Sequence, residues 1–312
     1  MPYKPGYTSS DEISSPRGAL AWPDGAQCAV QIVVNLNLAL SADGICESDL
    51  ATDKAHFALH EGLDTILRML DAFGLKATFA VPGILARLLP VRMAALRDAG
   101  HEIAAQALFG EDVSSLPEDE ELLRLKATSD SIAEATGSRP AGWFSLPRPS
   151  DAYASGMVSE HTPRLLCLAG YRYLGSGLAD DIPHYWVTDA EKGSSLLTMP
   201  YYYHQDDQYF ALFPAQGSGI ENTDMLARNW HTEFAAQHAR GRYFSMTLHP
   251  LHSGWGHRSE FLARFWKSMT SCSKIWNPTV DECARYWLKT YPAEAALRLE
   301  SPIWKDYPDS LS

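Results

Sequence analysis

Short apolar runs alternate with segments of helical periodicity along most of the sequence, and this alternation restricts the fold more than any other feature. The runs at 28–38, 76–81 and 242–248 are apolar and rich in β-branched or aromatic residues, as in strands buried on both faces. Between them, apolar residues recur at helical spacing, as at 55–73. Alternating strands and helices predict a parallel sheet covered by helices, and 312 residues suffice for a closed or nearly closed barrel.

The charge of the chain disfavours two classes of partner. The 26 basic and 38 acidic residues give a formal net charge of −12. A protein that binds a duplex or an anionic membrane needs a basic face, so we expect neither nucleic-acid nor membrane partners. No apolar run reaches the roughly 18 residues of a membrane span, and the polar N-terminus lacks the apolar core of a secretory signal. Five cysteines without a CxxC pair suggest reduced thiols, and we therefore expect a cytoplasmic protein.

The chain is expected to form one domain. We find no internal repeat, no low-complexity tract and no linker long enough to divide it. We expect a barrel domain over 21–295, preceded by an extended arm over 1–20 and followed by a tail over 296–312.

Polar residues stand where several predicted strands end. Asn35 and Asn37 follow the first strand, Gln106 follows the third, and His249 follows the last long one. In parallel α/β folds the chemistry lies at the carboxyl ends of the strands, so these side chains are expected at one mouth of the barrel.

The chain resembles the polysaccharide deacetylase (NodB-homology) superfamily, in particular its branch of allantoinases and cyclic imide hydrolases. The likeness covers about residues 20–290 and implies a distorted (β/α) barrel with fewer than eight strands. Five segments resemble the superfamily and follow one another in its order: WPDGAQCAVQIVVNLN, LKATFAVPG, GHEIAAQALFGED, TGSRPAGW and TLHPLHSGWGHR. Two further segments, DDIPHYWV and MPYYYHQDDQYF, resemble the branch.

The resemblance also implies a metal site that this sequence has lost. Metal-dependent members carry an Asp-Asp pair after the first strand and two histidines after the third, and one Asp serves as base. The corresponding residues here are Asn35, Asn37, Gln106 and Gly110. Neutral carboxamides are weak ligands for zinc-like ions, so we expect no metal and no cofactor. His249, in the Leu-His-Pro motif, is retained and corresponds to the acid that protonates the leaving nitrogen.

We therefore predict His249 to be the catalytic acid/base, the alternative being a core histidine bonded to backbone. Asn35 and Asn37 share one face of a strand and are predicted to bind substrate, the alternative being hydrogen bonds to backbone. Gln106 is either an oxyanion-type donor or a satisfied buried amide.

Further residues are predicted to bind substrate, and each also has a purely structural or solvent-exposed alternative. His60 and His56 have i, i+4 spacing that could hold a metal, but no third ligand is near in sequence. His204, Asp206 and Asp207 either pair as imidazole and carboxylate or form a solvated loop, and the aromatic residues either stack on a flat substrate or fill the core. The remaining predicted substrate contacts are His60, Trp143, Phe144, Tyr201, His204, Asp207, His252 and Arg258.

Two classes of function follow. The first is a metal-independent hydrolase of a C–N bond in an amide, cyclic imide or ureide, although no carboxylate remains at the ancestral base position. The second is a non-catalytic binding or interaction homologue of the barrel, or an isomerase or lyase that uses His249 for proton transfer. The resemblance also implies a homo-oligomer, a dimer or tetramer.

Overall fold

A computed structural model describes residues 20–149, 158–177, 180–189, 192–209 and 223–293. The expected arm and tail, apart from Leu20, lie outside these residues. The described helices include none that is both long and apolar enough to cross a bilayer.

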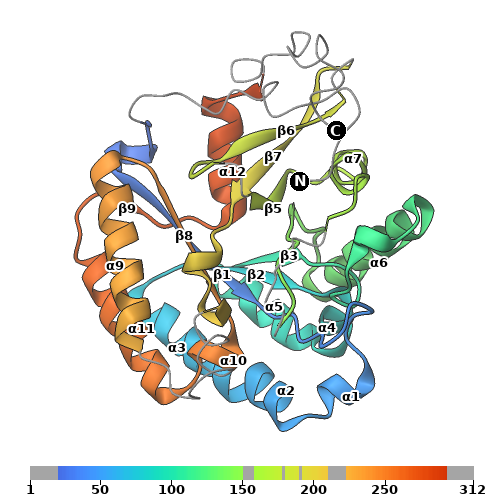
Figure 1. Cartoon of the computed structure of the whole chain (residues 1–312), viewed down its shortest axis with the longest axis horizontal. Helices are drawn as coiled ribbons and strands as arrows, with labels where there is room; N and C mark the ends of the chain where they lie inside the picture. Colours follow the sequence, from blue (N-terminus) through green and yellow to red (C-terminus); the bar gives the residue numbers. More distant parts are fainter. Residues whose placement is uncertain (1–19, 150–157, 178–179, 190–191, 210–222, 294–312) are drawn as a thin grey trace, which may run out of the picture.

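Strands and helices alternate as the sequence predicts (Figure 1). The strands are β1 (Cys28–Asn35), β2 (Thr78–Val81), β3 (Glu102–Ala105), β4 (Gly142–Trp143), β5 (Tyr173–Gly177), β6 (His184–Asp189), β7 (Ser194–Pro200), β8 (Tyr243–Leu248) and β9 (Ile275–Trp276). The α-helices are α1 (Glu47–Leu50), α2 (Asp53–Phe57), α3 (Leu63–Phe73), α4 (Gly83–Leu88), α5 (Pro90–Asp98), α6 (Glu118–Thr136), α7 (Thr162–Leu168), α9 (Thr223–Arg240), α10 (Pro250–Ser253), α11 (Gly256–Thr270) and α12 (Val280–Thr290). Shorter turns are η2 (Pro23–Gly25), η3 (Ala58–Gly62), η4 (Val113–Ser115) and η5 (Tyr203–Gln205).

The strands form one nine-stranded sheet in the order β6-β7-β5-β4-β3-β2-β1-β8, with β9 paired to β1. Neighbours along this order run parallel except the antiparallel pair β6 and β7. Beyond β7, a parallel bridge joins Asp206 to Thr247 of β8. That bridge closes the curved sheet at its carboxyl end, so the α/β barrel expected from the resemblance is confirmed. The described sheet has nine strands, however, where fewer than eight were expected, because the short strand β9 and the antiparallel strand β6 extend it.

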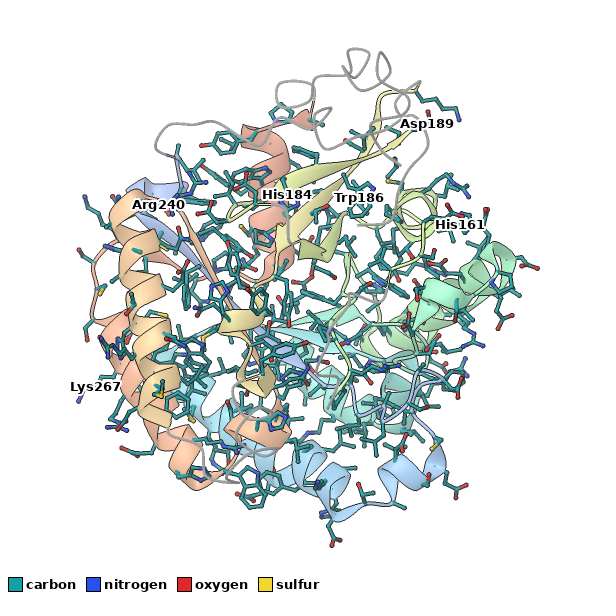
Figure 2. All side chains as sticks on the ribbon, viewed as in Figure 1. His161, His184, Trp186, Asp189, Arg240 and Lys267 are labelled. Carbon is teal, nitrogen blue, oxygen red and sulfur yellow. The ribbon has the colours of Figure 1, made fainter. Side chains whose placement is uncertain are left out.

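Each face of the sheet has its own hydrophobic core. On the outer face, Phe244 of β8 packs in one cluster with Leu70 of α3, Trp230 of α9 and Phe265 of α11. Inside the barrel, Tyr173 and Tyr243 share a second cluster with residues of α12, which fills the amino-terminal end. Side chains fill the space between the sheet and its helices (Figure 2). The carboxyl ends of the strands are thereby left for polar residues.

Two helical segments are interrupted. Residues 83–98 form two helices, α4 and α5, instead of one, because Pro90 has no amide hydrogen to donate and begins the second helix. The predicted helix from Ala55 to Phe73 contains the π-helical turn η3. At this turn Gly62 lies against α10, where an added Cβ would stand 2.5 Å from the carbonyl oxygen of Pro250. Only glycine permits this close packing beside His249.

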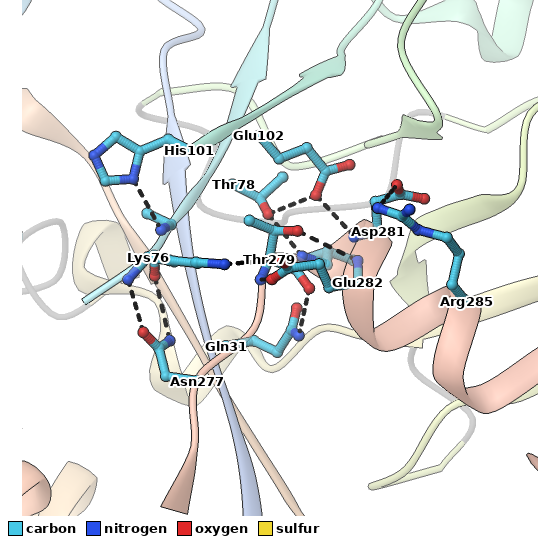
Figure 3. Close-up of polar contacts among 12 residues, drawn as sticks. Gln31, Lys76, Thr78, His101, Glu102, Asn277, Thr279, Asp281, Glu282 and Arg285 are labelled. Carbon is cyan, nitrogen blue, oxygen red and sulfur yellow. Dashed lines mark hydrogen bonds and ion pairs between the residues drawn. The ribbon is translucent and has the colours of Figure 1, made fainter. Parts of the chain in front are cut away.

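A partly buried carboxyl group anchors α12 in the barrel (Figure 3). Glu102 of β3 accepts hydrogen bonds from Thr78 Oγ1 and the Asp281 amide, each at 2.8 Å, and from Tyr173 OH at 2.8 Å. Thr78 Oγ1 in turn accepts from the amide of Val280. The free amides at the helix start are thus satisfied by the barrel. Burial nevertheless raises the pKa of Glu102 to about 7.

This raised pKa makes the stability of the fold depend on pH. The ordinary glutamate pKa of 4.5 holds in the unfolded chain, so the contribution is most favourable below pH 4.5 and is lost as pH rises through about 7. The loss corresponds to about 3 kcal/mol of unfolding free energy. Urea unfolding of the wild type and Glu102→Gln at pH 5, 6, 7 and 8 should show a flatter dependence in the variant. Parallel curves would contradict this assignment.

Candidate functional site

The ends of β1 and β8 bring the predicted catalytic histidine beside an asparagine. Val34 and Leu248 are paired in register, so Asn35 and His249 follow side by side. Asn35 Nδ2 lies 3.0 Å from His249 Nε2. Asn35 Oδ1 accepts from the amide of Asn37 at 2.9 Å, which fixes the orientation of this carboxamide. Asn35 therefore donates to Nε2, and the proton of a neutral His249 stands on Nδ1.

Asp207 holds the other side of the imidazole. His249 Nδ1 lies 2.7 Å from Asp207 Oδ1, and the amide of His249 donates to both carboxylate oxygens at 3.1 and 3.0 Å. Ser253 Oγ, one turn further along α10, donates to Oδ2 at 2.5 Å. Asp207 and His249 are both buried. This arrangement fixes the ring and its tautomer, as a carboxylate does when it orients a catalytic imidazole.

A second carboxylate lies against the same nitrogen. Asp206 Oδ1 is 3.4 Å from His249 Nδ1. Tyr201 OH donates to Asp206 Oδ2 at 2.6 Å, and the amide of Gln208 donates to Oδ1 at 2.9 Å. The bridge from Asp206 to Thr247 positions both acids against β8. The sequence alternative of a solvated acidic loop is therefore wrong for Asp206 and Asp207.

Burial and charge act in opposite directions on these groups. Burial alone would lower the pKa of His249, but the charge of Asp206 and the hydrogen bond to Asp207 raise it above its ordinary value. Burial alone would raise the pKa of Asp207, but the hydrogen bond from His249 and the charge of that ring lower it. For Asp206, burial prevails and the pKa rises to about 6. The site thus favours a protonated imidazole beside an ionised Asp207.

Asn37 is engaged with backbone. Its Oδ1 accepts from the amide of Ala39 at 2.9 Å, and its Nδ2 donates to the carbonyl of Gly110 at 3.0 Å. The alternative of backbone hydrogen bonds therefore describes Asn37, and no substrate contact is needed to satisfy its carboxamide. Asn35 instead contacts the histidine directly.

Gln106 is a buried carboxamide whose hydrogen-bonding capacity is unused. Asn35, Ala80 and Ala104 are aligned across β1, β2 and β3, so Gln106, two residues after Ala104, faces the same interior. Neither its Oε1 nor its Nε2 has a partner among the described residues. The next residue, Ala107, has a φ of 56°, a left-handed conformation that is strained for alanine. Such an amide and such strain are both typical of a binding site.

The residues at the ancestral metal positions do not fit a metal ion. Both oxygens of Asn35 and Asn37 already accept backbone amides. An added Cβ at Gly110, where the resemblance implies a second histidine, would lie 2.2 Å from Asn37 Oδ1, so the Asn37 carboxamide occupies the space that such a side chain would need. Asp206, Asp207 and His249 offer donor atoms within 4.8 Å of one another, but each of these groups is hydrogen-bonded within the cluster. We therefore derive no step through a metal.

A small cavity lies beside the imidazole. Its volume is about 10 Å³, about what a single water molecule requires. Asn35 and His249 both line it, as do Leu59 of η3 and His252 of α10. A larger cavity of about 780 Å³ lies between α3 and α5, away from all of the predicted site residues.

The remaining predicted contacts divide into two groups. His252 lines the small cavity, and Arg258 Nη1 donates to the His252 carbonyl at 3.1 Å. Phe144 faces the barrel interior, where its ring packs edge-on against Tyr173. The structure does not bring the others to His249: Trp143 lies in the outer core, because adjacent strand residues face opposite sides, and His60 and His204 are exposed.

The sequence prediction names Asp206 without pairing it with His249, and it does not include Ser253. Asp206 resembles part of a polar loop, and its approach to His249 depends on a bridge between segments 41 residues apart. Ser253 lies four residues after His249, and this helical spacing is a signal that could have identified it.

Comparison with known proteins finds similarity to the family that the sequence resembles. Residues 52–172 match the model of the family described as polysaccharide deacetylase. A putative polysaccharide deacetylase from Mycobacterium smegmatis is 26% identical, with a TM-score of 0.73 over 88% of this chain and 94% of that chain. Puue allantoinase is 22% identical, with a TM-score of 0.75 over 89% and 96%. A probable polysaccharide deacetylase from Pseudomonas aeruginosa PAO1 is 21% identical, with a TM-score of 0.73 over 87% and 94%. No curated protein sequence matches.

Proposed function

We propose that this chain is a member of the polysaccharide deacetylase (NodB-homology) superfamily and that it hydrolyses a C–N bond of a small amide, cyclic imide or ureide without a metal ion. The family supports a hydrolase of C–N bonds. The observation that carries the finer proposal is the buried hydrogen-bonded series from Asn35 through His249 to Asp207.

In this proposal His249 keeps the role of the ancestral acid and also takes over that of the ancestral base. The neutral form of the ring is the base, and in that form Nε2 carries the free electron pair, because Nδ1 donates its proton to Asp207. When a water molecule beside Nε2 displaces the Asn35 amide, the imidazole can take its proton while the oxygen attacks the carbonyl carbon. Asp207 stabilises the imidazolium. As the C–N bond breaks, Nε2 returns the proton to the leaving nitrogen, so protons balance over the cycle.

Gln106 is the proposed partner of the substrate carbonyl. Its Nε2, which is buried and has no partner among the described residues, can donate to the oxygen on which negative charge develops. Without a ligand or a water, leaving both of its amide atoms unpaired costs free energy, which a bound substrate would recover.

The Gln106→Leu substitution is expected to raise the stability of the protein and to lower its activity. Removing an unpaired buried amide should raise the free energy of unfolding by about 1 kcal/mol or more. Losing the donor should lower kcat by about 10²-fold. Urea unfolding and hydrolysis of a panel of cyclic imides, cyclic ureides and simple amides measure the two effects.

Gln31→Leu is the matched control. Gln31 is also buried on the barrel sheet and has an unpaired Oε1, but its Nε2 donates to the carbonyl of Thr279. This variant should lose stability and keep its kcat. If Gln106→Leu keeps full activity, Gln106 is a structural residue only.

A further inference from the structure

We propose that Asp206 is a positioning residue which, together with Asp207, stabilises the protonated imidazole of His249. The role belongs to the reaction proposed above and rests on it: the imidazole must hold a proton between the attack of water and the departure of the nitrogen. Asp206 touches neither water nor substrate in this role and acts only through His249.

The geometry places two carboxylates on one ring nitrogen. Nδ1 of His249 is 2.7 Å from Asp207 Oδ1 and 3.4 Å from Asp206 Oδ1. The side chain of Asp206 is 0% exposed and that of Asp207 is 3% exposed, so water screens neither charge. Tyr201 and the Gln208 amide each bind one oxygen of Asp206, and these bonds keep its carboxylate at ion-pair distance from the ring.

The groups around the imidazole leave the two acids as its dominant charges. From α10, the His252 ring lies 5.7 Å away between centroids, and Ser253 binds Asp207. From β1, Asn35 contributes a neutral amide, and Tyr201, whose pKa is raised well above its ordinary value by burial, donates to Asp206 as a neutral hydroxyl. No lysine or arginine among the described residues lies within ion-pair distance of either carboxylate. A protonated His249 is therefore their basic partner.

One carboxylate would make a neutral pair with the imidazolium, whereas two carboxylates leave an excess of negative charge. Burying that excess is unfavourable, and a proton on the ring reduces it. The resemblance implies two acids at positions 35 and 37, where this chain has asparagines. The two acids of this site are instead Asp206 and Asp207, which lie on the Nδ1 side of the imidazole. There they govern how firmly His249 holds a proton.

NMR titration of the histidine ring protons of Asp206→Asn between pH 5 and 9 tests this assignment. The amide keeps the size of Asp206 and removes its charge. The pKa of His249 should fall by about one unit or more relative to the wild type. The spectrum of His249→Gln, which lacks one of the 11 histidine signals, identifies the resonance.

Glu102→Gln, which removes a partly buried carboxyl at the opposite end of β3, is the control and should leave the His249 titration unchanged. Circular dichroism checks the fold, and Asp206→Ser serves if the asparagine variant does not fold. An unchanged His249 pKa in a folded variant overturns the proposal, even if the protein hydrolyses C–N bonds. A lowered His249 pKa supports the role of Asp206, even if no substrate is turned over. Failure of this inference is therefore distinguishable from failure of the proposed function.

Discussion

Replacing His249 with glutamine is expected to lower kcat for C–N bond hydrolysis by about 10²- to 10⁴-fold, the usual contribution of general acid–base catalysis. Glutamine retains a polar side chain but cannot accept a proton from water and return it to nitrogen. The measurement is the rate of release of the leaving nitrogen, or of ring opening, over the panel of cyclic imides, ureides and amides.

His238→Gln is the matched control for this experiment. His238 lies on α9, where its Nε2 is bonded to the carbonyl of Ser273, and it has no contact with the site. Its kcat should stay within about twofold of the wild-type value. A His249→Gln enzyme of wild-type activity would remove the imidazole from the mechanism and favour a binding protein on the same barrel.

Replacing Asp207 should affect both catalysis and stability. In Asp207→Asn, the size is kept but the amide cannot accept from all the donors now on Asp207, which include Nδ1 and the backbone amide of His249. The tautomer with Nε2 free is no longer favoured, so kcat should fall by on the order of 10⁴-fold, as when such an aspartate is replaced in a serine protease.

In Asp207→Ala the donors of His249 and Ser253 lose their acceptor altogether. Removing one partner of a buried charged pair typically costs about 3–5 kcal/mol, and urea unfolding at pH 7 should show a loss of that size. Asp130→Ala is the control, because the Asp130 and Arg139 side chains are 60% and 65% exposed and such pairs contribute about 1 kcal/mol or less. Equal losses in the two variants would contradict the buried role of Asp207.

The strands could be predicted because the burial of each one is reflected in its own run of apolar residues. Residues 28–35 are buried without exception, so their apolar pattern directly reflects their environment. The mouth of the barrel followed from the same reasoning, since Asn35 and His249 stand directly after predicted strands. Gln106 was identified in the same way from the end of β3.

The two carboxylates beside His249 could not be predicted from the local sequence pattern. In sequence, Tyr202–Gln208 is polar and resembles a solvated loop, yet Asp206 and Asp207 are buried because a long-range bridge closes the barrel there. The face of Trp143 was equally indeterminate, because a two-residue strand has too little alternation to define its sides. Such features depend on which distant segment covers a residue.

The central claim is that this barrel moves protons through His249 and uses no metal. The most direct measurement compares kcat after exhaustive chelation, with the metal content determined by elemental analysis, against kcat after addition of zinc, cobalt or manganese. The account predicts a chelated enzyme with well under one ion per chain and an unchanged kcat. Activity that is lost on chelation and returns in proportion to bound metal would contradict it.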